Sequence, residues 1–152
     1  LLDWDGTITV RILMCGSRTW RNQVIIWREC ERLLLRYGDA LIIIHGDEPN
    51  GADELIRLTC EELRIYHEMY CAAQPRYTAH KRFIIEQVAD WDVDGNAAGP
   101  KRNAHMLATG IDGVVGFRSP GKSNGTDHMC RIARKADKPV IVYQENGVCY
   151  AV

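Results

Sequence analysis

The feature that most constrains the fold is a pair of short apolar runs about thirty residues apart, each followed at once by a glycine. The first is residues 10–15 (VRILMC), before Gly16, and the second is residues 40–45 (ALIIIH), before Gly46. Runs of this length and composition are typical of buried β-strands. Two strands at this spacing leave room for one helix between them, which predicts a βαβ unit with parallel strands.

The segment between the two runs has the pattern of an amphipathic helix. Over residues 20–37, apolar side chains recur at steps of three and four residues, and Gly38 and Asp39 then provide a stop signal. The residues that we expect to face the core are Val24, Trp27, Cys30, Leu34 and Tyr37.

The same alternation returns in the second half of the chain. Residues 113–117 (GVVGF) predict a strand, residues 126–136 a helix, and residues 139–143 (PVIVY) another strand. Strands without a polar face are buried on both sides, which is typical of parallel sheets that helices cover on both faces. The sequence therefore predicts an α/β fold, a Rossmann-like, doubly wound, mainly parallel sheet with helices on both faces.

The middle of the chain is less regular. Residues 82–88 (RFIIEQV) predict a third strand, residues 90–100 a loop, and residues 101–108 a helix, whereas residues 74–81 follow no clear pattern. An unusually long second helix is expected over residues 53–70, on the spacing of Ile56, Cys60, Leu63, His67 and Tyr70.

Composition narrows the function classes. With 152 residues, 46% of them apolar, we expect a tail over residues 1–9 and a single domain over residues 10–152. The net charge of -1 provides no basic field for nucleic acid, so a nucleic-acid partner is not expected. The apolar run of residues 40–44, whose length no other run exceeds, is far too short to span a membrane, and no secretory leader opens the sequence, which favours a cytoplasmic location.

The six cysteines are scattered singly. Because zinc sites and disulfide scaffolds use closely paired cysteines, we expect buried, reduced thiols and no metal site.

Several glycine-bearing loops follow the predicted strands. In an open parallel sheet, ligands bind beyond the carboxyl ends of the strands, where loops lead into helix N-termini. Glycines let backbone N–H groups approach an anion, and the helix dipole favours negative charge there. The loop residues in question are Gly16, Ser17 and Arg18; Gly46, Asp47, Gly51 and Asp53; and Gly121, Lys122, Gly125 and Thr126. Together they predict a phosphate-binding edge.

Two shorter strings suggest other chemistry. Residues 3–8 (DWDGTI) fit the DxDGT[LI] string of the haloacid dehalogenase superfamily, but only two residues precede it, so we expect a surface tail. Residues 116–123 (GFRSPGKS) satisfy the P-loop pattern GxxxxGK[ST]. Asn124 and Gly125 follow at once and are expected to break the helical turn that a P-loop needs. A P-loop NTPase is kept as an alternative.

From residue 11 onward, the chain resembles the YspA-type SLOG family, Rossmann-like proteins related to the LOG nucleoside-phosphate hydrolases and to the DNA-processing protein DprA. The resemblance covers about residues 10–143. It is carried by residues 11–20 (RILMCGSRTW), 45–53 (HGDEPNGAD), 89–106 (ADWDVDGNAAGPKRNAHM) and 120–129 (PGKSNGTDHM). The third string is the most specific, because it follows the pattern ADWDxxGxAAGPxRNxxM without a gap.

The resemblance implies a protein that binds a nucleotide or nucleotide derivative, such as an ADP-ribose-like or NAD-like molecule or a nucleoside phosphate. A sensor, carrier or sequestering module is the expected role. Ser17, Arg18 and Arg102 are donors suited to phosphate, and Gly125 and Thr126 lie where a helix N-terminus faces an anion.

Other residues in the matching strings suit the rest of such a ligand. Asp47 and Asp53 are acceptors for ribose hydroxyls, and Trp20 and Trp91 are aromatic side chains that either stack on a base or pack in the core. Asn103 either orients its neighbour Arg102 or caps a helix. His45, at the end of a buried strand, is either a structural residue or a ligand contact.

The resemblance weakens where catalysis is concerned. LOG enzymes carry PGGxGTxxE, whose Glu is the catalytic acid, and Met129 stands in its place here. Asp127 is a weak substitute, because an acid in the first turn of a helix more often complements the dipole. An N-glycosidic hydrolase of nucleoside 5′-monophosphates therefore remains an alternative. Residues 61–81 look like an insertion, and relatives that pair through helices imply a homodimer.

Overall fold

The computed structural model of the chain describes residues 6, 8–72 and 83–152, with the backbone alone for residues 83–87. The strands in these ranges are β1 (Val10–Gly16), β2 (Leu41–Gly46), β3 (Tyr66–Cys71), β4 (Phe83–Gln87), β5 (Gly113–Phe117), β6 (Val140–Tyr143) and β7 (Cys149–Ala151). The helices in these ranges are α1 (Gln23–Tyr37), α2 (Ala52–Leu63), α3 (Trp91–Asp94), α4 (Ala98–Ala108) and α5 (Asn124–Lys135), with 3-10 turns at Gly38–Ala40 and Gly95–Ala97.

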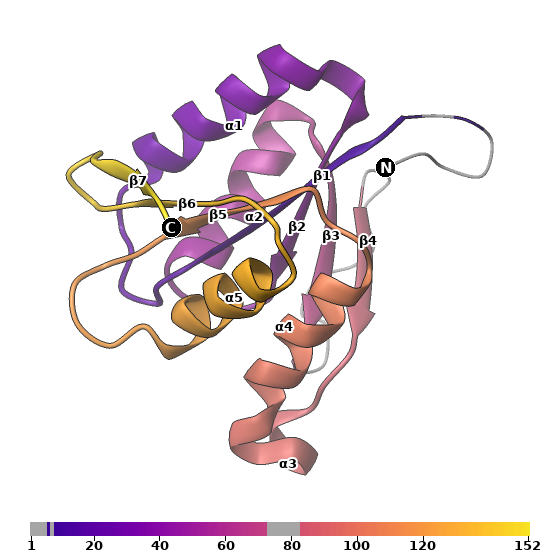
Figure 1. Ribbon diagram of the computed structural model, residues 1–152, viewed down its shortest axis with the longest axis vertical. Helices are drawn as coiled ribbons and strands as arrows, with labels where there is room; N and C mark the ends of the chain where they lie inside the picture. The colour runs from indigo at the N-terminus through magenta and orange to yellow at the C-terminus, as the bar shows by residue number, and fades with distance from the viewer. Residues whose placement is uncertain (1–5, 7, 73–82) are drawn as a thin grey trace.

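The described strands form one twisted sheet in the order β4-β3-β2-β1-β5-β6-β7 (Figure 1). Strands β1 to β6 run parallel, and β7 pairs antiparallel with β6. This arrangement confirms the predicted Rossmann-like α/β fold. The direction of strand addition reverses between β1 and β5, which makes their carboxyl ends the switch point of the sheet.

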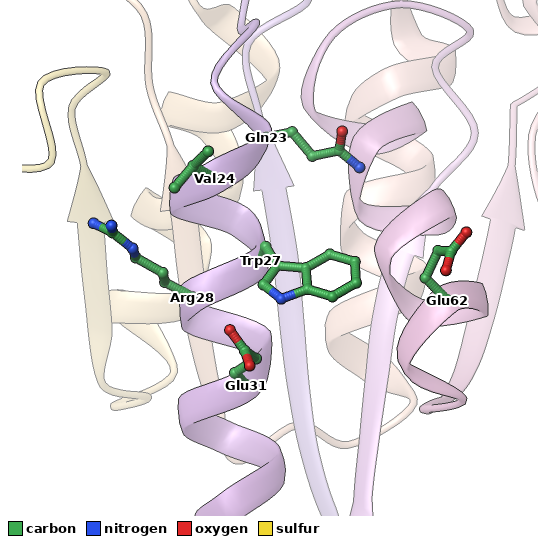
Figure 2. Close-up of a pocket in the computed structure, with 6 residues that line it drawn as sticks. All are labelled: Gln23, Val24, Trp27, Arg28, Glu31 and Glu62. Carbon is green, nitrogen blue, oxygen red and sulfur yellow. The ribbon is translucent and has the colours of Figure 1, made fainter.

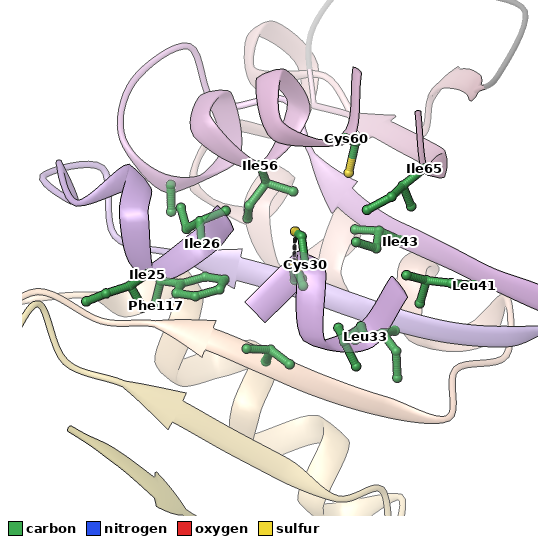
Figure 3. Close-up of a cluster of buried hydrophobic side chains, with 14 of the residues drawn as sticks. Ile25, Ile26, Cys30, Leu33, Leu41, Ile43, Ile56, Cys60, Ile65 and Phe117 are labelled. Carbon is green, nitrogen blue, oxygen red and sulfur yellow. Dashed lines mark hydrogen bonds between the residues drawn. The ribbon is translucent and has the colours of Figure 1, made fainter. Parts of the chain in front are cut away.

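Helices cover both faces of the sheet, and each face has its own core. On one face, α1 and α2 pack on β1, β2 and β5, as the cluster in Figure 3 shows around Ile26, Ile43 and Ile56. On the other face, α4 and α5 contribute Met106 and Met129 to a second cluster. The central strands are therefore buried from both sides, as their continuous apolar runs predict.

Helix α1 begins three residues later than predicted, because Asn22 is its N-cap: the side chain of Asn22 accepts a hydrogen bond from the backbone N–H of Ile25. The expected core stripe is also partly wrong. Val24 is 56% exposed, and the buried residues of the helix are Ile25, Ile26, Glu29, Cys30 and Leu33. The true stripe is rotated around the helix axis, and the buried carboxylate of Glu29 is satisfied by Arg32 and by the hydroxyl of Tyr143.

The long second helix predicted over residues 53–70 is wrong. Helix α2 ends at Leu63, where Arg64 adopts the left-handed conformation (φ 55°) and the N–H of Ile65 returns to the carbonyl of Cys60. Strand β3 follows, with His67 and Met69 buried on alternate positions. The strand predicted over residues 82–88 is consequently the fourth, β4, and not the third.

Several smaller features differ from the predictions, and others lie outside the described residues. A helix begins at Asn124, so Asn124 and Gly125 open α5 and do not break it. Cys149 is exposed, in contrast to the other five cysteines, and none of the six forms a disulfide. Strand β7 was not predicted; it has only three residues, and all three are exposed. The aspartates of the DWDGTI string and residues 73–82 of the expected insertion lie outside the described residues.

No helix in the described part of the chain is long and apolar enough to cross a membrane.

Candidate functional site

The loops that leave β1 and β5 lie side by side at the switch point. The first runs from Ser17 to Asn22 and leads into α1, and the second runs from Arg118 to Ser123 and leads into α5. The N–H of Ser17 donates to the carbonyl of Phe117 at 2.9 Å, which continues the pairing of β1 with β5 into the loops. In a doubly wound sheet this is the place where ligands bind.

Three serines join the two loops beneath their surface, two through their side chains and Ser119 through its backbone N–H. The Oγ atom of Ser17 accepts the N–H of Ser119 at 2.9 Å and lies 2.6 Å from the Oγ atom of Ser123. All three serines are buried, and Ser119 also donates to the carboxylate of Glu145 at 2.6 Å. Ser17, predicted as a phosphate donor, therefore pins the two loops together, and Ser119 and Ser123 are partners that the sequence analysis missed.

Two predicted ligand glycines allow close packing between loops. A Cβ atom on Gly16 would lie 2.4 Å from Cβ of Ala52 and 2.5 Å from the carbonyl oxygen of Phe117. Gly51 has φ +77°, and a Cβ atom there would lie 2.4 Å from the carbonyl oxygen of Ser17. That carbonyl also accepts the N–H of Ala52 at 3.1 Å, so the start of α2 is fixed against the β1 loop.

A buried carboxylate, that of Asp53, lies behind these loops and is near the charge of Arg102. Asp53, in the first turn of α2, is 7% exposed, and its Oδ2 atom accepts the N–H of Glu48 at 3.2 Å. Burial raises the pKa of Asp53, the guanidinium of Arg102 lowers it, and the charge of Asp47 raises it. Gly46 leaves the space for both side chains, since its Cβ would lie 2.8 Å from Oδ2 of Asp53 and 3.0 Å from Cζ of Arg102.

Arg102 is a residue of α4 that lies at this edge of the sheet, beside Gly46. Its Nε atom is buried and has no hydrogen-bond partner among the described residues. A donor in this position is suited to an incoming acceptor, because a guanidinium that is buried without a partner leaves hydrogen-bonding capacity unused. The neighbouring Asn103 serves another purpose than the two expected: its Nδ2 donates to the carbonyl of Gly125 at 3.0 Å and lies 3.2 Å from Nδ1 of His128, which ties α4 to the start of α5.

The start of α5 is the exposed part of the site. Gly121, Lys122 and Gly125 are exposed, and a Cβ atom on Gly125 would meet nothing within 4 Å. Thr126 points inward and is buried. Backbone N–H groups at a helix start with an open approach are the ordinary form of a protein anion site.

The P-loop alternative does not fit this geometry. In a P-loop the Lys and the Ser lie in the first turn of the helix. Here both Lys122 and Ser123 precede α5, and the Ser123 hydroxyl, which would be a magnesium ligand in a P-loop, is buried against Ser17.

Neither of the two residues considered for acid catalysis, Met129 and Asp127, is suited to that role. Met129 is completely buried in the core cluster beneath α5. Asp127 receives two hydrogen bonds from Arg118, at 2.8 Å and 3.1 Å, and these bonds lower the pKa of the Asp127 carboxyl. A general acid needs a raised pKa, so Asp127 is held in the wrong protonation state for that role.

The two predicted aromatic residues differ sharply. Trp20 is completely buried, packs edge-on against Phe117 at 5.5 Å and donates its Nε1–H to the carbonyl of Asn22. It is therefore a core residue, which is the packing alternative of the two that the sequence left open. Trp91 is 39% exposed, and the guanidinium of Arg18 lies 6.0 Å from the centre of its ring. Arg18 in turn pairs with Glu48 at 3.0 Å.

His45 is a structural residue. Its Nδ1 donates to the carbonyl of Gly46 at 2.9 Å, its Nε2 lies 2.8 Å from Nδ1 of His67, and burial lowers the pKa of His45 to about 4. Both imidazoles are buried between β2 and β3. No group of three or more metal-ligating side chains occurs in the described ranges of the chain.

The chain is similar to a phage protein and to solved structures with a Rossmann-like fold. No protein-family model matches it. It is 31% identical to the Gene 61 protein of Mycobacterium phage D29 over 131 residues, which cover 86% of this chain and 94% of the phage protein.

Solved structures share the fold at lower identity. A structural-genomics target designated TM1055 is 16% identical with a TM-score of 0.59, and the match covers 87% of this chain and 72% of that one. The Moco carrier protein of Chlamydomonas reinhardtii is 17% identical in two structures, with TM-scores of 0.57 and 0.58. Those matches cover 88% and 89% of this chain and 75% and 76% of the algal chains.

Proposed function

The chain belongs to the family of the Gene 61 protein of Mycobacterium phage D29, and we propose that it binds a phosphate-bearing nucleotide or nucleotide derivative at the β1/β5 edge of its sheet. In this proposal the protein is a YspA-type SLOG module that senses, carries or sequesters its ligand. The observation that carries the proposal is the open start of α5. It is supported by Arg102 of the neighbouring helix α4, whose buried Nε has no partner among the described residues.

In this proposal, separate groups of the protein bind the phosphate, the ribose and the base of the ligand. The phosphate lies at the loop from Gly121 to Gly125, whose residues are exposed except for Ser123 and where the α5 dipole favours an anion, and Arg102 donates to it from α4. Asp47 lies beside the ribose as an acceptor, and the exposed face of Trp91 stacks on the base.

Binding is favoured over turnover, because neither Met129 nor Asp127 can serve as the acid that LOG enzymes use in this loop. Met129 is buried and Asp127 is an ionised partner of Arg118. The name of the algal neighbour, a carrier of the molybdenum cofactor, also supports a carrier role.

Isothermal titration with AMP, ADP-ribose, NAD and ATP, each with and without Mg²⁺, tests the proposal. We expect binding of at least one adenine nucleotide without Mg²⁺. Gly125→Asp places a carboxylate at the start of α5, which suits the helix dipole but repels phosphate, so binding should fall about tenfold or more while the protein stays folded. Gly125→Ala fills the same open space without charge and is the matched control.

A second pair of variants tests the α4 side. Arg102→Gln should weaken binding about tenfold or more, whereas Arg134→Gln, on an exposed position in the last turn of α5, should leave it unchanged. Lys122→Ala should weaken binding less than Arg102→Gln does, since only a P-loop depends on that side chain. Binding that requires Mg²⁺ and is lost in Lys122→Ala, or equal binding in Gly125→Asp and Gly125→Ala, would contradict the proposal.

A further inference from the structure

The outer face of α1 carries four exposed side chains in a row, which we name the outer stripe: Val24, Arg28, Glu31 and Leu35. Their spacing of four, three and four residues places them within an arc of roughly 60° on a helix that turns 100° per residue. The buried residues of α1 lie on the opposite side of the helix. The outer stripe is therefore the line along α1 that faces farthest from its own core.

The chemistry of the outer stripe is unusual for a helix surface. Its two ends are apolar and exposed, with Leu35 at 88% and Val24 at 56%. Its two middle residues are an arginine and a glutamate. Within the described part of the chain, no ion pair engages Arg28 or Glu31, in contrast to Arg32, which pairs with Glu29 at 2.5 Å.

The order apolar, basic, acidic, apolar complements itself when the helix is reversed. If two α1 helices pack antiparallel about the midpoint of the outer stripe, Val24 faces Leu35 of the second copy and Arg28 faces Glu31. A two-fold axis then repeats each contact, as an isologous interface requires. We propose that the outer stripe is the interface of a homodimer in which the α1 helices of two copies pack antiparallel.

A cavity beside the stripe fits the same arrangement. It measures about 410 Å³ and lies between α1 and α2, with Trp27 between the two helices and Glu62 on the α2 side (Figure 2). Val24, Arg28 and Glu31 of the outer stripe also line it. Leu35 of the second copy, opposite Val24, is placed to enter this hollow as a knob enters a hole between paired helices.

The occupant is a second copy because the complementarity lies within one sequence. Each copy offers both the exposed Leu35 and the cavity that receives it, and both members of the ion pair. Burial of two Leu35 and two Val24 side chains would remove from water the most exposed apolar residues of α1. The proposed interface therefore lies on α1.

Sedimentation equilibrium of the full chain tests the interface. We expect wild type to be a dimer and Leu35→Glu to raise the dimer dissociation constant about 100-fold or more, because each new carboxylate would lose the apolar contact of Leu35 and enter a hollow already lined by Glu31 and Glu62. Leu35 is already 88% exposed, so this change leaves the fold of each copy intact. The matched control is Val93→Glu on α3, where an 81% exposed apolar residue lies away from the outer stripe, and it should remain dimeric.

Charge reversal then tests the antiparallel register. Arg28→Glu and Glu31→Arg should each weaken self-association about tenfold, because each places like charges opposite one another. A mixture of the two variants restores both ion pairs and should form a heterodimer, and the double variant should again form a homodimer. A wild type that is monomeric at about 100 µM, an unchanged dimer in Leu35→Glu, or no association in the mixture would overturn the proposal.

Discussion

Two halves of the same sheet edge use similar residues for opposite purposes. The packed half comprises Gly16, Ser17, Gly46 and Gly51, whose neighbours are backbone and side chains of adjacent loops. The open half comprises Gly121, Lys122 and Gly125, which are exposed and have nothing within 4 Å of a Cβ at Gly121 or Gly125. The comparison teaches that a glycine-bearing loop after a strand does not by itself indicate a ligand. Only the open half has room for one.

The largest effect is expected on the free energy of unfolding, from a substitution that disrupts the packed half. Gly16→Ala places a methyl group 2.4 Å from Cβ of Ala52 and 2.5 Å from the carbonyl of Phe117, so the two loops must separate. We expect the free energy of unfolding to fall by about 3 kcal/mol or more, measured by urea denaturation. Gly125→Ala, in the open half, should raise it by about 0.5 kcal/mol, because alanine is the better helix residue. Equal effects at the two glycines would remove the distinction.

A change of pH tests how much His45, which precedes Gly46 of the packed half, contributes to stability. Burial lowers the pKa of His45 from 6.5 to about 4, so the unfolded chain binds the proton first as the pH falls. The stability that neutral His45 provides is complete above pH 6.5 and is lost as the pH falls toward 4, by about 3 kcal/mol. Urea denaturation across this window should show the loss, and His45→Gln should flatten that slope even though its absolute stability is lower. A slope that His45→Gln leaves unchanged would contradict the assignment.

A smaller effect is expected at the serine junction between the halves. Ser17→Ala removes the acceptor of the buried Ser119 N–H and the partner of the Ser123 hydroxyl. The free energy of unfolding should fall by about 2 kcal/mol, because buried polar groups are left without partners. Lys122→Ala, only one residue from Ser123 but exposed, is the control and should change it by less than about 0.5 kcal/mol. A Ser17→Ala protein as stable as wild type would show that the junction is not structural.

The smallest effect is expected on ligand affinity at the open half. Asp127→Asn removes a carboxylate beside the start of α5 and releases Arg118, so the affinity for an anionic nucleotide should rise about threefold. Isothermal titration measures the change. Asp137→Asn, an exposed acid beyond the other end of α5, should leave the affinity unchanged. A loss of affinity in Asp127→Asn would instead assign that carboxylate to ligand binding.

Much of the fold follows from local patterns. The apolar runs of β1, β2, β5 and β6 are visible because these strands are buried from both faces and so have no polar positions. Strand β3 was missed because its buried His67 and the residues before it also fit a helical period. The decisive signal is the left-handed conformation of Arg64, and an arginine carries no sequence mark of that conformation.

The candidate site, like the fold, was predictable from the sequence only in part. By itself the sequence determined which loops meet at the carboxyl edge of the sheet, since the order of strands and helices fixes that edge. Only the tertiary structure decided which members of those loops are accessible: it buried Trp20 and Thr126, left Trp91 and Gly125 exposed, and tied Asp127 to Arg118. The physical reason is that the edge is set by chain order, whereas exposure depends on how residues far apart in the sequence pack against one another.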